Sequence, residues 1–336
     1  SLDPPFSKGG RCGQSPQFLG FKFGGDRVEY FNIILNQVFF FSTCLAVGFA
    51  AQRIGFITDD MVFAISKFMM KVIIPIMVLT LTASSGTRSE LISVWPFGLC
   101  VIGMYIIHFA VSFLSGKILG LKKPEINSHI CSCAFVNSAL IGYPIIMAMF
   151  PEKSGLFIAV FLIVETVVTW TVGVMILSSA KGKGEINLKK MVTPMTIGLV
   201  IGLIMVVIDI HPNNIFWNTL TNIGAMQKYL GLIYLGADIG RRGFKKLFAR
   251  PKVLFTVPIK LLVVPLCVFF VLHFIGMAED IVRAVTVFSM LPTMLIITIL
   301  TAEYDAAPDY GSGAILATTV CCLATMPAVF YIISFF

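Results

Sequence analysis

The chain has 336 residues, of which 57% are hydrophobic and only 12% are charged, and its mean hydropathy is +0.92. Soluble proteins carry about 25% charged residues, so this composition excludes a water-soluble domain and predicts an all-α polytopic membrane protein in a lipid bilayer. The net charge of +8 does not indicate a nucleic-acid partner, because the basic residues lie mostly in short loops between apolar runs.

Residues 1–29 are rich in Gly and Pro and contain no apolar run of the length found in a signal peptide. We interpret them as a flexible N-terminal tail, either native or an added extension. Ten apolar runs of about 20 residues follow, each long enough to cross a bilayer as a helix. Nine spans is the alternative, because the seventh run is the least hydrophobic. The ten predicted spans are residues 31–56, 60–83, 94–119, 125–149, 154–179, 191–209, 219–240, 252–276, 279–302 and 311–335.

Basic residues gather in the loops that follow the odd-numbered spans, above all at 181–190 and 241–252. The loops after the even-numbered spans hold only Arg88, Lys153 and Arg283. Cytoplasmic loops are enriched in Lys and Arg. We therefore expect a multi-pass protein of the plasma (inner) membrane, with both termini outside and the 181–190 loop in the cytoplasm.

The spans divide into two sets of five, residues 30–180 and 191–336, on either side of the 181–190 linker. Five is an odd number, so the two sets cross the membrane in opposite directions. Pro144 and Pro292 each lie in the fourth span of their set. Helices broken at matching positions of an inverted repeat point to the central binding site of a transporter, whereas the plainer interpretation is that these prolines only kink their helices.

A proline in a membrane helix removes one backbone donor and frees a carbonyl one turn earlier. Two such breaks meeting in mid-membrane would expose helix ends, and the N-terminal ends suit an anion. Asn137 precedes Pro144 by two turns, and its amide can donate to a carboxylate or simply join two helices. We therefore predict substrate-binding residues at the two breaks. They are Asn137, Gly142, Pro144, Pro292 and Thr293.

Two ionisable residues lie deep in predicted spans. Glu165 would be costly as an unpaired carboxylate in lipid, so we predict that it binds a coupling H⁺ or Na⁺ together with Ser138, the alternative being a static polar contact. Lys260 either extends to the cytoplasmic side or pairs with Glu165 or an anionic substrate. For Lys71 we expect an interfacial position, and for His108 packing or gating.

Three segments resemble the auxin efflux carrier family over about residues 31–336. They are RIGFITDDMVFAISKFMMKVIIPIMVL at 53–79, FVNSALIGYPIIM at 135–147 and LPTMLIITILTAEYDAAPDYGSGAILATTVCCLATMPAVFY at 291–331. The short central loop resembles prokaryotic members. Plant members of the family have Gln where this chain has Thr293, so auxin specificity is not supported.

The resemblance implies ten helices in two inverted repeats whose fourth and ninth helices are broken and crossed. This is the elevator fold of bacterial sodium–proton antiporters and bile-acid symporters. Spans 1, 2, 6 and 7 would form a scaffold, with a homodimer through it, and spans 3–5 and 8–10 a moving transport domain. Substrate carboxylate would bind near Asn137. Plant relatives export auxin, and bacterial relatives are associated with malate and malonate.

These observations predict a secondary-active transporter, by family default an efflux carrier, of small organic anions. No phosphate-binding loop of an ATP-driven pump is present, and the eight Cys lack metal-site spacing. We therefore expect no enzyme activity, no cofactor and no metal. A membrane receptor, a sensor or a channel on the same fold are the alternatives.

Overall fold

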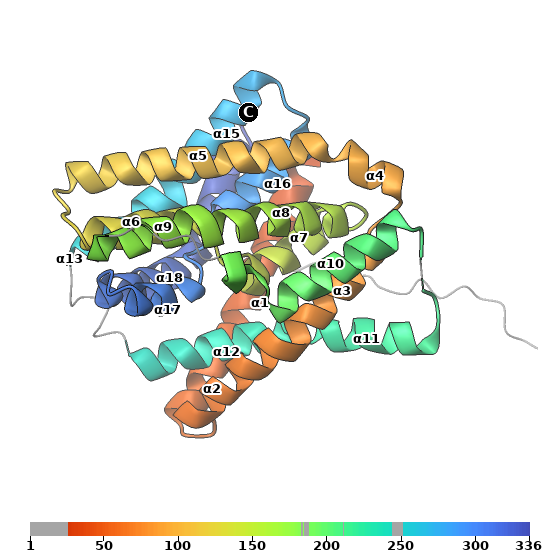
Figure 1. The fold of residues 1–336 in the computed structure, drawn as a ribbon, viewed down its shortest axis with the longest axis horizontal. Coiled ribbons are helices and arrows are strands. Elements are labelled where there is room, and N and C mark those ends of the chain that lie inside the picture. The colour runs from red at the N-terminus through yellow and green to blue at the C-terminus, as the bar shows by residue number, and fades with distance from the viewer. Residues whose placement is uncertain (1–25, 183, 185–187, 211, 244–250) are drawn as a thin grey trace, which may run out of the picture.

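The computed structural model describes residues 26–336 except 183, 185–187, 211 and 244–250 (Figure 1). Most of the predicted tail at 1–29 therefore lies outside the described residues. Within them, all regular structure is helical apart from one isolated bridge between two residues. Six helices are long and apolar enough to cross a membrane: Asn32–Arg53, Asp59–Ala83, Trp95–Ile118, Ser154–Ser178, Lys252–Ile275 and Pro308–Ile333. The protein is thus an integral membrane protein.

The α-helices of the first part of the chain follow the predicted spans closely. They are α1 (Asp26–Arg53), α2 (Asp59–Phe68), α3 (Ile74–Ala83), α4 (Arg88–Ser93), α5 (Trp95–Ile118), α6 (Glu125–Ala134), α7 (Tyr143–Met149), α8 (Ser154–Val168) and α9 (Val174–Ser178). Short 3₁₀ turns at Ser179–Lys181 and Leu188–Met191 overlap the two ends of the predicted linker at 181–190.

The second part contains the remaining α-helices. They are α10 (Pro194–Val207), α11 (Ile215–Ala225), α12 (Gln227–Arg242), α13 (Pro251–Leu254), α14 (Thr256–Pro258), α15 (Val264–Ile275), α16 (Glu279–Ser289), α17 (Ile296–Glu303) and α18 (Pro308–Ile333). The weakly hydrophobic seventh run is helical over both α11 and α12, which meet at Met226.

Several helices contain a wider, π-helical turn, at Met69–Ile73, Ser138–Gly142, Thr169–Gly173 and Ile259–Val263. Three of these turns lead directly into a helix with proline in its first two positions, namely Pro75, Pro144 and Pro265. A proline has no N–H and its ring clashes with the carbonyl one turn back. A π turn relieves that clash, so these helices bend at the proline without ending there.

The break predicted at Pro144 is therefore misplaced. Helix α6 ends at Ala134, residues 135–137 are extended, and the chain is helical again from Ser138 through Pro144. The prediction for Pro292 is correct, because Pro292 lies in the non-helical stretch between α16 and α17.

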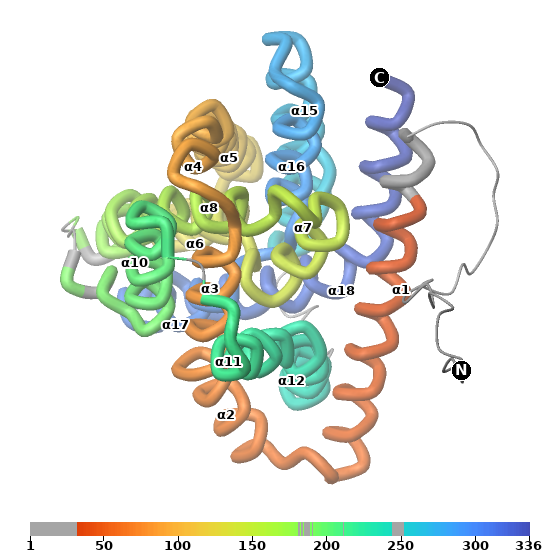
Figure 2. The backbone as a smooth tube through the Cα atoms, turned by 90° about the vertical axis from the view of Figure 1, so that its right-hand side faces the viewer, coloured from red at the N-terminus to blue at the C-terminus, as the bar shows by residue number. Residues whose placement is uncertain are grey.

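One group of helices packs through glycines. A Cβ on Gly236 of α12 would lie 2.1 Å from the carbonyl oxygen of Leu45 on α1, and one on Gly198 of α10 would lie 2.6 Å from that of Pro75 on α3. Gly224 of α11 similarly abuts the backbone of Met77 on α3. Small residues allow this backbone contact between membrane helices. In Figure 2, α11 and α12 lie in the lower part of the view below α3, with α1 beside α12.

The other group surrounds the two broken helices. Helix α5 packs on α6, α8, α15 and α16, and α18 packs on α6 and α17. Stacked phenylalanines fill its interior, with ring centroids 3.7 Å apart for Phe161 and Phe288 and 4.4 Å apart for Phe97 and Phe157. Large apolar side chains such as Phe39, Phe63 and Ile106 remain 64–75% exposed on the outside, as expected of a surface that faces lipid.

The starts of α4 and α10 are stabilised by hydrogen-bonded caps outside the packed interiors of the two helix groups. Thr87 caps α4 and forms a reciprocal capping box with Glu90, whose carboxylate accepts the backbone N–H of Thr87 at 2.7 Å. This hydrogen bond lowers the pKa of the Glu90 carboxyl. Thr193 and Thr196 form the equivalent box at the start of α10.

Candidate functional site

The two broken helices meet at their breaks. Residues 135–137 and 290–295 are the non-helical stretches, and they pair with each other through the backbone. The contacts are an antiparallel bridge between Val136 and Thr293, a hydrogen bond from Asn137 N to Pro292 O (2.8 Å) and one from Met294 N to Phe135 O (3.1 Å). Backbone groups in a membrane interior must be satisfied within the protein, and here each break supplies partners to the other. We call this region the crossing.

His108 of α5 joins the two helices that end at the crossing. Its Nδ1 lies 2.9 Å from Ala134 O, the last residue of α6, and its Nε2 lies 2.8 Å from the Oγ of Ser289, the last residue of α16. A carbonyl only accepts hydrogen bonds, so Nδ1 carries the proton, and in the neutral ring Nε2 accepts from the serine. His108 is thus a packing residue that ties both helix ends together.

Thr293 is also engaged inside the crossing. Its hydroxyl donates to Ser132 O at 2.7 Å, and its backbone N–H donates to the Oγ1 of Thr318 at 3.1 Å. The side chain is fully buried and does not line a cavity. Its predicted place at the break is correct, but its hydrogen-bonding groups are used within the protein.

A cavity of about 280 Å³ lies beside the crossing. Asn137 and Ser138 reach it from the start of the π-helical turn, Glu165 from α8, and Met294 from the other break. Its further lining is mostly apolar. The other lining residues are Met70, Lys71, Ile74, Ala139, Leu140, Thr166, Thr169, Trp170, Thr193, Pro194, Met195, Thr196, Leu295 and Ile296. The cavity therefore reaches the start of α10, next to the predicted cytoplasmic linker.

Three residues of the cavity lining each have a fully buried side-chain atom without a hydrogen-bond partner in the described part of the chain: Asn137 Nδ2, Glu165 Oε1 and Thr169 Oγ1. Asn137 is only 4% exposed. Buried polar groups are nearly always hydrogen-bonded, so three open groups around one cavity mark a place for a polar ligand or water. The unpaired amide of Asn137 can donate to an anion.

Glu165 is 1% exposed, and the hydroxyl of Ser138 donates to its Oε2 at 2.6 Å. That length is typical of a hydroxyl donating to a carboxylate. Tyr105 and Tyr143 lie within electrostatic reach of the same carboxyl group. The predicted association of Glu165 with Ser138 is therefore present, and the side chain of Tyr105 also interacts with this carboxyl group.

Lys260 does not extend to the cytoplasmic side. It is fully buried in the π-helical turn Ile259–Val263, and its Nζ has no hydrogen-bond partner among the described residues. It interacts electrostatically with Cys133 and Glu165 but makes no direct ion pair with Glu165. Cys133 lies in the last turn of α6, where the partial negative charge of the helix end favours a cation.

Gly142 and Pro144 do not line the cavity. A Cβ on Gly142 would lie 2.5 Å from the side chain of Leu291, so the glycine allows the two breaks to pack closely. Pro144 is buried in the first turn of α7. Of the five predicted substrate-binding residues, only Asn137 reaches the cavity.

Some lining residues were missed by the sequence. Thr169 lies one helical turn after Glu165, a spacing that could have indicated it. Lys71, expected at the interface, lines the cavity as an exposed residue. No local signal points to the start of α10, because only the tertiary structure brings it to the cavity.

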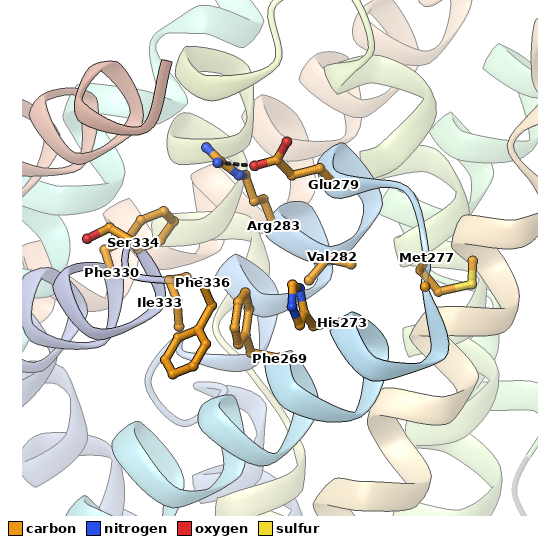
Figure 3. A pocket seen from close by; sticks show the side chains of 11 residues that line it. Phe269, His273, Met277, Glu279, Val282, Arg283, Phe330, Ile333, Ser334 and Phe336 are labelled. Carbon is orange, nitrogen blue, oxygen red and sulfur yellow. Dashed lines mark hydrogen bonds and ion pairs between the residues drawn. The ribbon is translucent and has the colours of Figure 1, made fainter. Parts of the chain in front are cut away.

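A second cavity, of about 360 Å³, lies between the ends of α15, α16 and α18. Figure 3 shows the rings of Phe269 and Phe336 and the side chain of His273 along it, with Arg283 paired to Glu279 above them. It contains no residue of the crossing. Since its arginine already has a carboxylate partner, the cavity beside the crossing is the better candidate for an anion.

Comparison with protein families gives one match, which covers nearly all of the described chain. A family model described as "membrane transport protein" matches residues 33–331. A search among curated proteins finds no match.

Proposed function

Because the chain belongs to the membrane transport protein family that includes the auxin efflux carriers, we propose that it is a secondary-active transporter of small organic anions, working by an elevator movement and without covalent chemistry. The observation that carries this proposal is that Asn137, whose amide nitrogen has no hydrogen-bond partner among the described residues, lines the cavity beside the crossing. Efflux is the direction that the family resemblance favours.

The proposed architecture is ten spans in two inverted repeats, residues 30–180 and 191–336. Support comes from the two broken helices, which occupy the fourth position of each half and pair with each other. The glycine-packed helices α1, α2–α3, α10 and α11–α12 would be the scaffold, and a homodimer would form through them. The helices around the crossing would be the transport domain.

The substrate carboxylate would accept the Asn137 amide proton, and Lys71 would add a favourable charge from the exposed side of the cavity. Met70, Ile74 and Trp170 supply an apolar wall. This lining supports a weak acid with one carboxylate and an apolar body more than a dicarboxylate such as malate or malonate.

Glu165 would bind the coupling ion, H⁺ or Na⁺. Glu165 lines the same cavity as Asn137, and an ionised carboxylate at this depth is costly without a charged partner. Substrate and coupling ion would then occupy neighbouring places, so each could change the affinity for the other.

The cavity reaches the start of α10, so this conformation would face the cytoplasm if the 181–190 linker lies there. The distribution of basic residues supports that orientation, with both termini outside the plasma membrane.

The test is uptake of radiolabelled malate, malonate and indole-3-acetate into proteoliposomes, with and without imposed pH and Na⁺ gradients. Asn137→Ala is the test variant, and Asn218→Ala, on the exposed surface of α11, is its matched control. Saturable flux that is lost only in Asn137→Ala would support the proposal. No flux of any acid through folded protein would contradict it in favour of a receptor or sensor, and ion currents far above carrier turnover would indicate a channel.

A further inference from the structure

The side chain of Gln227 links the glycine-packed helices to the broken helix. Gln227 is the first residue of α12 and is 1% exposed. Its Nε2 donates a hydrogen bond to the carbonyl oxygen of Ala139, in the π-helical turn Ser138–Gly142. Ala139 itself lines the cavity beside the crossing.

The carbonyl of Ala139 needs a donor because of the proline that follows. In the π-helical turn each N–H bonds to the carbonyl five residues earlier, as Gly142 N does to Asn137 O and Tyr143 N does to Ser138 O. The next pair in this series would join residue 144 to Ala139. Residue 144 is proline and has no N–H. Gln227 supplies the missing donor from another helix.

The shape of α12 fits this role. The turn at Met226, between α11 and α12, starts a new helix at Gln227, and Gly231 follows one turn later. A Cβ on Gly231 would lie 3.2 Å from the Cδ2 of Leu140, so the glycine leaves room for that side chain. Gln227 and Gly231 thus form a seat for the cavity-lining pair Ala139 and Leu140.

We propose that Gln227 is a positioning residue of the candidate transport site. It replaces the hydrogen bond that Pro144 deletes, and it thereby holds the turn Ser138–Gly142, with Asn137 at its start, against α12 in this conformation. Pro144 in turn keeps the Ala139 carbonyl free for this bond between helices. If the transport proposal is correct, the bond joins the scaffold to the moving domain and breaks during transport.

The test compares hydrogen–deuterium exchange, by mass spectrometry, of the segment Ser138–Met149 in ligand-free protein in lipid nanodiscs. In Gln227→Leu we expect amide exchange of this segment to rise about tenfold, because a hydrogen bond that holds the turn is lost. In the double variant Gln227→Leu/Pro144→Ala the new N–H of residue 144 bonds to Ala139 O, so exchange should return close to the wild-type rate. Gln52→Leu, at the far end of α1, is the control and should leave the segment unchanged.

Unchanged exchange in Gln227→Leu, or no restoration in the folded double variant, would overturn the proposal. If Gln227→Leu does not fold, the yield of folded protein becomes the measurement: recovery by Pro144→Ala supports the proposal and its absence contradicts it. No substrate is present, so this result is independent of whether any organic anion is transported.

Discussion

The glycine-packed helices and the helices at the crossing are held together by opposite kinds of contact. At the closest contacts between α1 and α12 one helix lacks a side chain, and the backbone of Gly236 lies directly against that of Leu45. At and beside the crossing the helices are interrupted. Side chains such as His108, Thr293 and Gln227 there make hydrogen bonds to backbone carbonyls that lack a partner within their own helix. The glycine contacts between helix backbones leave no room for an added atom. The contacts at the crossing can be exchanged one hydrogen bond at a time.

This difference matches the mechanical roles that an elevator would need. Close packing through small residues depends on shape and gives a rigid unit. Each side-chain hydrogen bond contributes only about 1 kcal/mol to stability. The free energy needed to break a few of them during a transport cycle is therefore small. Four predictions, from the largest expected effect to the smallest, test the contrast.

Adding one methyl group to the glycine-packed helices should have the largest effect. In Gly236→Ala the new Cβ would lie 2.1 Å from the carbonyl oxygen of Leu45, so α1 and α12 must separate. We expect Tm in detergent to fall by about 5–10 °C, or folded protein to be lost. The control is Gly103→Ala in α5, where nothing lies within 4 Å and alanine favours the helix. Equal Tm values for the two variants would contradict the difference drawn between the glycine contacts and the crossing.

Replacing the carboxyl group of Glu165 by a neutral amide should abolish ion coupling without unfolding the protein. In Glu165→Gln the amide oxygen can still accept the hydrogen bond from Ser138, so we expect Tm to change little. The dependence of transport on pH or Na⁺ should disappear, as measured by flux into proteoliposomes over a range of external pH and Na⁺. Glu152→Gln, in an exposed loop, is the control. A variant that retained both dependences would rule out Glu165 as the coupling residue.

Deleting one hydrogen bond at the crossing should have a moderate effect on stability. Thr293→Val keeps the shape of the side chain but removes the donor to Ser132 O, which lies inside the protein. We expect a loss of about 1–2 kcal/mol, measured as a lower Tm. Thr219→Val on the exposed face of α11 removes a hydroxyl that bonds only within its own helix and should be nearly neutral. Equal effects would mean that the bond at the crossing is unimportant.

The smallest effect should come from the exposed charge on the cavity. Lys71→Gln should raise the KM for the transported anion about two- to fivefold, and this difference should shrink in high salt because exposed charges are screened. Lys228→Gln is the control, since Lys228 lies over the ring of Phe40 and not on the cavity. An effect independent of salt would indicate a direct, desolvated contact.

Six of the ten predicted spans are apolar helices of membrane length among the described residues, because long hydrophobic runs are a strong signal. Three of its candidate residues, Asn137, Ser138 and Glu165, line one cavity, and their roles in binding stay predictions. The place of the first break was wrong. A π-helical turn absorbs Pro144, and the break forms at 135–137, where the backbone pairs with the other half of the chain.

The errors share one physical origin, which is partners that are distant in sequence. Lys260 was expected either to reach water or to pair with Glu165 or an anionic substrate. It lies buried within electrostatic reach of Cys133 and Glu165, and no local pattern indicates that the end of α6 is nearby. The role of Gln227 was likewise invisible, because its acceptor is 88 residues away. The periodicity of apolar residues indicates which face of a helix is apolar, but it does not indicate which other segment packs against that face.

The bridge between Val136 and Thr293 has an evolutionary consequence. It is made by main-chain atoms, which every residue except proline can provide in full. Mutations that change neighbouring side chains, such as Asn137 or Met294, therefore leave the junction itself intact. New cargo preferences can arise by point substitution, while the architecture that presents the cargo is inherited unchanged.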